Sequence, residues 1–173
     1  MSDPSNPEVS SSARPKAVDQ LFDLDLALSS IMGVRTNIPE DALTAPILGT
    51  ERTGHGILIN EDGLVVTIGY LITEAESVWL VDCHGNAVPG HVVGYDQETG
   101  LGLVQALKSR NLPALTLGNS DDLDLSHAVI AASHGGIGHA MNAQVIAKRE
   151  FAGYWEYVLD EAIFTVPAHP SWG

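Results

Sequence analysis

Residues 54–68 read GHGILINEDGLVVTI, and this stretch decides the fold. It contains two runs of aliphatic residues joined by the corner Glu61-Asp62-Gly63. Such a corner is a strong short-range signal for a β-hairpin, because glycine supplies the positive φ that the turn needs. Leucine and isoleucine fill both faces of the two runs too densely for strands with one side in water. The stretch therefore predicts a hairpin inside a closed or two-layered β structure.

Short aliphatic runs recur along the rest of the chain, and turn residues separate them. The strands expected from these runs are 31–36, 77–81, 88–94, 101–107, 128–132, 142–149, 154–159 and 163–166. Short strands with frequent turns are typical of an antiparallel barrel. Residues 15–28 favour a helix that starts at a proline, although the alternation of Phe22–Leu28 leaves a strand open there.

Two further motifs accompany the hairpin. Residues 93–99 read VGYDQET, and residues 112–120 read LPALTLGNS. Together with the Gly-x-Gly hairpin, these motifs resemble the HtrA-type (Deg-like) serine proteases, where they form a Val-Gly-x-Asp-x-x-Thr turn and the linker between two barrels. The resemblance extends from near Ile31 to the end of the chain. It implies an all-β, trypsin-like fold of two antiparallel β-barrels.

The resemblance also locates two of the three catalytic positions of that family. The family places its general base in Thr-Asn-x-His-Val-Val, whereas residues 67–72 read TIGYLI and put Tyr70 in that slot. Its aspartate lies in Thr-Asp-Ile-Ala-Leu-Leu, and residues 99–104 put Gly100 there. A serine hydroxyl needs a base to take its proton and a carboxylate to orient that base. A phenol that titrates near pH ~10 is a poor base at neutrality, so two triad roles are expected to be vacant.

The third catalytic position falls in residues 167–173, which read PAHPSWG where the family has Gly-Asn-Ser-Gly-Gly. One register puts Trp172 in the nucleophile slot and Pro170 on the family's glycine. The other puts Ser171 in that slot and Trp172 on the glycine that follows. Pro170 removes a backbone N–H from the region of the oxyanion hole, where one donor is worth roughly 2.7–4 kcal/mol. Neither register predicts a competent catalytic site.

The sequence therefore favours a catalytically inactive HtrA-like domain that acts through protein or peptide binding. A serine endopeptidase or hydrolase with residual activity through Ser171 is the alternative. A second alternative is a metal-binding module built on His134 and His139 of the loop SHGGIGH, with His169 as a weaker candidate. A stable zinc site usually takes at least three protein ligands. A turn with solvated histidines is thus the favoured interpretation, and no metal or cofactor is expected.

An aromatic group occupies residues 151–157, which read FAGYWEY. On a strand, Tyr154 and Glu156 face one way while Trp155 and Tyr157 face the other. One set is expected in the core, and the other could line a surface that takes a peptide. Core packing alone is the favoured interpretation.

Three segments are expected along the chain. Residues 1–15 are polar and predict a disordered tail, residues 16–112 a helix and the first barrel, and residues 113–173 a second barrel that is truncated at its C-terminal end. A sheet that stops there leaves an open edge, through which the protein could associate with itself.

The composition restricts the partners. The chain has 173 residues, of which 22 are acidic and 8 basic, and its net charge is −14. Nucleic-acid binding depends on lysine and arginine that neutralise phosphates, so neither nucleic acid nor an anionic membrane is an expected partner. The N-terminal residues lack the apolar core of a signal peptide. The expected location is cytoplasmic if Met1 is the native start, although HtrA relatives are typically exported.

Overall fold

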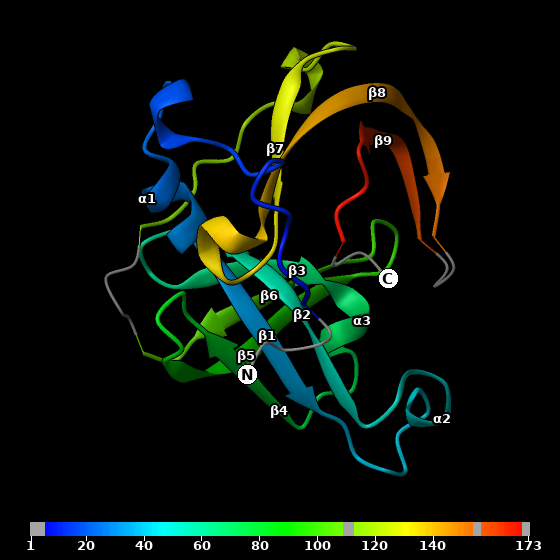
Figure 1. Ribbon diagram of the computed structural model, residues 1–173. Helices are drawn as coiled ribbons and strands as arrows, with labels where there is room; N and C mark the ends of the chain where they lie inside the picture. The colour runs from blue at the N-terminus through cyan, green and yellow to red at the C-terminus, as the bar shows by residue number, and fades with distance from the viewer. Residues whose placement is uncertain (1–5, 109–112, 154–156, 171–173) are drawn as a thin grey trace.

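A closed antiparallel barrel forms the first half of the molecule. The computed structural model describes residues 6–108, 113–153 and 157–170. The strands of the barrel are β1 (Ile31–Asn37), β2 (Glu51–Leu58), β3 (Leu64–Ile68), β4 (Ser77–Val81), β5 (Ala87–Asp96) and β6 (Leu101–Ala106). They close in the order β1-β2-β3-β6-β5-β4 (Figure 1). This confirms the predicted β class and the first barrel.

The hairpin that the sequence predicted consists of β2 and β3. Gly56 pairs with Thr67, and Leu58 pairs with Val65. Gly63 takes φ +93° in the turn, where glycine has no steric cost. The side-chain oxygen of Asn60 accepts a hydrogen bond from the backbone N–H of Leu64 at 2.8 Å, which closes the turn.

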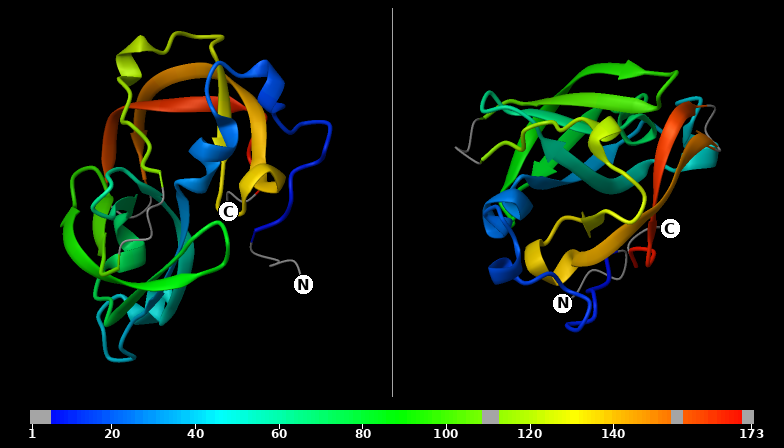
Figure 2. Two further views of the ribbon diagram at one scale, coloured as in Figure 1. Left: turned by 90° about the vertical axis from the view of Figure 1, so that its left-hand side faces the viewer. Right: turned by 90° about the horizontal axis from the view of Figure 1, so that it is seen from above.

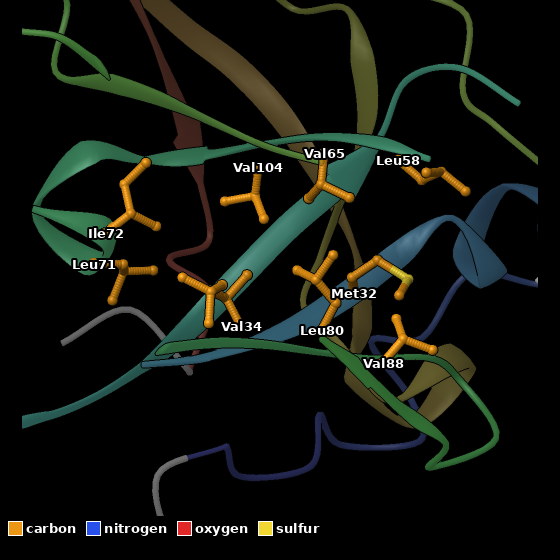
Figure 3. Close-up of a cluster of buried hydrophobic side chains, with 10 residues drawn as sticks. Met32, Val34, Leu58, Val65, Leu71, Ile72, Leu80, Val88 and Val104 are labelled. Atoms are coloured by element: carbon orange, nitrogen blue, oxygen red, sulfur yellow. The ribbon is translucent and has the colours of Figure 1, made fainter. Parts of the chain in front are cut away.

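The core of the barrel is aliphatic. Figure 3 shows the side chains pointing into the barrel from opposing strands and from the short helix α3 (Gly69–Ile72). The buried members are Met32, Val34, Leu58, Val65, Leu71, Ile72, Val78, Leu80, Val88 and Val104. Burying one valine or leucine side chain stabilises a fold by roughly 1.5–3 kcal/mol, so this cluster holds the barrel together.

A second sheet packs beside the barrel. It consists of β7 (Ala128–Ala132), β8 (Ala140–Ala152) and β9 (Val158–Val166), in the order β7-β8-β9. Figure 2 shows β8 and β9 running side by side as one long, curved ribbon. The register shifts of their pairing, between Val145 and Ala147 and between Arg149 and Phe151, are β-bulges that bend the ribbon. The described residues thus form an open three-stranded sheet in place of a complete second barrel.

The strand boundaries correct two predictions in this sheet. The sequence predicted separate strands over 154–159 and 163–166, but β9 is continuous from Val158 to Val166. Of the first predicted strand, residues 154–156 lie outside the described residues. Strand β8 is also longer than expected, because its pairing with β9 continues through both bulges.

The helices are short. They are η1 (Ala17–Asp19), α1 (Leu24–Ser29), α2 (Ala45–Leu48), α3, η2 (Ser120–Asp122) and η3 (Gly136–His139). The helix predicted over 15–28 is wrong in extent, because α1 begins only at Leu24. Asp23 caps its N-terminus, where the Asp23 side chain accepts a hydrogen bond from Leu26 N. Within the described residues, no helix has the length and apolar character to cross a membrane.

Residues 6–15 are ordered where disorder was expected, and residues 1–5 of the predicted tail lie outside the described residues. Residues 6–15, here called the strap, lie against the second sheet. The side chain of Val9 is 3% exposed, and Val9 N donates to Gly138 O at 2.8 Å. The strap continues along the sheet, with Asn142 N donating to Ala13 O at 2.9 Å. A buried apolar side chain and paired backbone groups outweigh the polar composition that predicted a disordered tail.

Candidate functional site

Tyr70 lies on α3, directly after β3. Its side chain is half-buried and packs against the core of the barrel. The Tyr70 carbonyl accepts a hydrogen bond from Arg52 Nη1 at 2.5 Å, which holds α3 against β2. Burial raises the pKa of the Tyr70 phenol above its ordinary value, and the nearby Tyr157 raises this pKa further. The phenol is therefore protonated at neutral pH and offers no base.

Gly100 lies in the turn between β5 and β6, directly before the first residue of β6. Its backbone is left-handed, with φ +70°. Its carbonyl accepts a hydrogen bond from Gly69 N at 2.6 Å, which ties the turn to the first residue of α3. The two positions that the resemblance assigns to the base and its aspartate are therefore adjacent in space. Neither carries a side chain that is a general base at neutral pH.

Tyr157 fills the space beside Gly100. A β-carbon added to Gly100 would stand 2.7 Å from Cγ of the Tyr157 ring. Tyr157 directly precedes β9, and its neighbour Val158, the first residue of that strand, donates its N–H to Glu98 O of the first barrel at 3.0 Å. The second sheet is thus attached to the first barrel at the position where the family has its aspartate.

The aromatic group of the sequence divides between this contact and the surface. Phe151 lies 6.3 Å from Tyr157 and 6.0 Å from Phe164, between ring centroids. The guanidinium carbon of Arg149 lies 4.6 Å from the centroid of the Phe164 ring. Phe151 is 39% exposed. The expectation for Tyr154, Trp155 and Glu156 falls outside the described residues.

The candidate nucleophile positions Ser171 and Trp172 also lie outside the described residues, so their register stays a prediction. The segment that leads to them is described as far as Pro170. His169 is 4% exposed, and its Nε2 donates to the carbonyl of His139 at 2.9 Å.

The three histidines of the metal hypothesis do come together, and His55 of β2 joins them. His134 N donates to His55 Nδ1 at 3.3 Å, and His134 Nε2 donates to Asp82 O at 2.9 Å. The charges of His134, His169 and His139 act on His55, after burial, to lower its pKa. Among the described residues, however, no three histidine, cysteine or acidic side chains are arranged to hold a metal ion. The metal-binding alternative therefore has no support from this geometry.

Sequence reasoning did not place His55 in this group. The glycines on either side of His55 gave no signal for it, because Gly54 and Gly56 lie against Leu71 and Val65 of the barrel. The group also contains no pair of histidine and carboxylate like that of a triad. The Asp82 carboxylate accepts instead from the backbone N–H groups of His84 and Asn86, and from the Asn86 side chain.

Comparison with known proteins identifies the family. The family model described as "Trypsin-like peptidase domain" matches residues 54–173. The chain belongs to this trypsin-like peptidase family. Within it, the chain is HtrA-like, because its similar relatives and its structural neighbours carry that description.

Two curated relatives show the extent of the likeness. A "Probable periplasmic serine endoprotease DegP-like" of Chlamydia pneumoniae is 35% identical over 78 residues, which are 45% of this chain and 16% of the relative. "Serine protease HTRA1" of Xenopus tropicalis is 27% identical over 79 residues, which are 46% of this chain and 17% of the relative. The chain thus matches a small part of the length of each.

Solved structures support the fold. The structure titled "HtrA-type protease AlgW with tripeptide" superposes with a TM-score of 0.62 at 18% identity, covering 83% of this chain and 48% of its own. The same protease "with decapeptide" gives a TM-score of 0.62 at 18% identity, covering 82% and 49%. At this identity, the likeness shows the trypsin-like fold alone.

Within the trypsin-like family, chemistry depends on the groups that stand at three corners of one cleft. In this HtrA-like chain, the two positions that the resemblance assigns to the base and its aspartate hold a protonated phenol and a glycine that an aromatic ring covers. The Tyr70 phenol can donate a hydrogen bond, but it is no general base at neutral pH.

Proposed function

We propose that this HtrA-like domain is catalytically inactive and acts by binding a protein or peptide. The observation that carries the proposal is the contact between Tyr157 and Gly100. An aspartate at position 100 would place its β-carbon where the Tyr157 ring now lies. It would also have to adopt a positive φ, which residues other than glycine disfavour. This packing supports a site that has no place for a carboxylate at position 100.

Tyr70 supports the same conclusion. In the register that puts Ser171 in the nucleophile slot, the serine would find a protonated phenol in the slot of its base, because the raised pKa of Tyr70 keeps that phenol protonated at neutral pH. In the other register Trp172 offers no nucleophile. The nucleophile of a serine protease is weak without an adjacent base. Loss of a triad member typically leaves only residual catalysis that comes from the oxyanion hole and substrate binding.

The second sheet offers a surface for the partner. Strand β9 has partly exposed apolar side chains, with Val158 45%, Ile163 38% and Val166 45% exposed. Strand β9 pairs with β8 along one edge, and no other described strand pairs with it. An extended peptide could add a strand to such an edge, with main-chain hydrogen bonds for affinity and side-chain contacts for selectivity. The same edge would support self-association.

A fluorescein-labelled β-casein chain tests both parts of the proposal. We expect wild-type protein to bind it, as measured by fluorescence anisotropy, and to leave it intact on a gel after prolonged incubation. A fluorophosphonate probe is expected to leave Ser171 unlabelled. The test variant is Ser171→Ala. Its matched control is Ser120→Ala, because Ser120 is an exposed serine far from Ser171 along the chain.

The alternative function, a hydrolase that uses Ser171, makes the opposite prediction. Casein turnover that disappears in Ser171→Ala and persists in Ser120→Ala would overturn the inactive assignment. Absence of casein binding at high micromolar concentration would overturn the peptide-binding part while leaving the inactive assignment in place.

A further inference from the structure

Four of the seven histidines of the chain meet at one junction. His55 comes from β2 of the barrel, His134 and His139 from the loop between β7 and β8, and His169 from the segment after β9. The junction therefore joins the barrel to one end of the second sheet, where β7 ends, β8 begins and β9 ends. It lies outside the positions that the family uses for its base and aspartate.

The contacts at the junction depend on the protonation of the rings. His134 N donates to His55 Nδ1 at 3.3 Å, so His55 Nδ1 carries no proton. The His134 ring lies against the β1 backbone, because a β-carbon added to Gly33 would stand 3.3 Å from His134 Nδ1. His139 Nδ1 is buried and has no hydrogen-bond partner among the described residues.

The strap is fastened to the same loop. Asn6 Nδ2 donates to His134 O at 2.6 Å, and Ser133 Oγ donates to Asn6 Oδ1 at 2.8 Å. Further along, Val9 N donates to Gly138 O at 2.8 Å. A change at His134 therefore acts on the strap as well as on the barrel.

We propose that the His55–His134 contact is a proton-sensitive latch that holds the strap and the second sheet against the barrel. When His55 takes up a second proton, both of its ring nitrogens become donors, and the bond from His134 N is lost. A positive charge then appears in a partly buried site beside three other imidazoles. Both effects weaken the junction in acid.

The charged groups around His55 do not offset this effect. Burial lowers the pKa of His55 from its ordinary 6.5, and the charges of His134, His169 and His139 lower it further. The strands that flank His55 present Gly33 of β1 and the Thr67 hydroxyl of β3, which are uncharged.

Two carboxylates near the loop are already engaged. Asp82 accepts hydrogen bonds within its own turn, from His84 N, Asn86 N and Asn86 Nδ2. Glu8 of the strap, which lies near Gly138, pairs with Arg14 at 2.7 Å. Neither carboxylate contributes a resolved charge effect that would favour the protonated form of His55.

The direction of the pH effect follows from linkage. The unfolded chain binds a proton at His55 below pH 6.5, whereas the folded protein binds it only at a lower pH, because its His55 pKa is lower. The stability that His55 contributes is therefore complete above pH 6.5 and falls as the pH decreases toward the folded pKa. One linked proton raises the unfolding equilibrium constant by up to about tenfold for each pH unit in that window.

Urea unfolding of the whole chain between pH 7.5 and 5.5 tests the latch. In His55→Asn, Oδ1 can accept from His134 N at both pH values, because it does not titrate. We expect wild type to lose stability across this range and His55→Asn to lose distinctly less. The matched control His91→Asn, at an exposed position of β5, is expected to follow wild type. Equal losses in wild type and His55→Asn would overturn the proposal.

Hydrogen exchange separates the latch from a general acid effect. We expect protection factors of the strap amides, Val9 above all, to fall in wild type on going from pH 7.5 to 5.5 and to stay constant in His55→Asn. Unchanged protection in wild type would contradict the latch. Should His55→Asn fail to fold, an NMR titration of the wild-type imidazoles decides: a His55 midpoint at or above 6.5 overturns the proposal, and a lower midpoint supports it.

Discussion

The ring of Tyr157, the residue before β9, packs against Gly100 in the turn between β5 and β6, the position that the resemblance assigns to the family's aspartate. The contact requires glycine for two separate reasons. Position 100 has φ +70°, and a β-carbon there would stand 2.7 Å from the ring. The first reason concerns the backbone alone, and the second concerns the packing of the two halves of the molecule.

These two reasons can be separated by experiment. Gly85 has φ +80° with no atom within 4 Å of its would-be β-carbon, so Gly85→Ala has only the backbone cost, roughly 1–2 kcal/mol. Gly100→Ala has the same cost and also displaces the Tyr157 ring. We expect urea unfolding to show the larger loss of stability for Gly100→Ala. Equal losses would mean that the Tyr157 ring moves aside freely.

Arg52 is expected to be essential for the position of α3. It is 4% exposed and donates to the carbonyls of Tyr70 at 2.5 Å and Thr73 at 3.1 Å, and to Thr44 Oγ1 at 2.7 Å. Arg52→Met leaves these buried acceptors without a donor and should cost about 2–4 kcal/mol in the free energy of unfolding.

The matched control for Arg52 is Arg35→Met, at an exposed position of the neighbouring strand β1. We expect it to change the urea midpoint little, because an exposed arginine leaves no buried acceptor behind. Similar losses for both variants would show that the Arg52 hydrogen bonds contribute no more than a surface charge.

Asp82 is expected to control stability in acid. Burial raises the pKa of its carboxyl group, but hydrogen bonds from the Asn86 side chain and from Asn86 N and His84 N outweigh burial, and the pKa lies below its ordinary 3.8. With a depressed folded pKa, the contribution is complete above the unfolded pKa and lost as the pH falls through the folded one.

Thermal unfolding between pH 5 and pH 2 checks this expectation. Asp82→Asn should lower the melting temperature at pH 5 and flatten its decline toward pH 2, relative to wild type. Asp41→Asn, at an exposed position between β1 and β2, serves as the control and should follow wild type. A decline in Asp82→Asn as steep as in wild type would contradict the assignment.

Tyr70 is expected to limit stability in alkali. Burial and the nearby Tyr157 raise its pKa above the ordinary 10.0. The unfolded chain therefore loses this proton at a lower pH than the folded protein, so stability falls as the pH rises through that interval. Urea unfolding between pH 9 and 11 should show a smaller decline for Tyr70→Phe than for wild type. An identical decline in the two proteins would mean that the phenol is not buried in solution.

Much of the first barrel could be predicted from local patterns. Strand β4 of the barrel matches its predicted range, and β1 differs by one residue at its end. Strand β7 of the second sheet also matches its predicted range. Alternation of side chains over short runs, and glycine at turns with positive φ, are properties of neighbouring residues. Such local patterns predict the same strands and turns whatever the distant segments of the chain do. The extent of α1 and the order of the strap were not predictable in this way, because a side-chain cap at Asp23 and the burial of Val9 overrule composition.

The candidate site divides in the same manner. The sequence alone predicts that Tyr70 and Gly100 stand in the slots of a base and its carboxylate, because the motifs around them resemble those of the family. Only the tertiary structure decided that Tyr157 covers Gly100 and that His55 meets His134, 79 residues away along the chain. Contacts between distant segments depend on how two sheets pack, and that packing is set by the summed burial of many side chains, which no local pattern encodes.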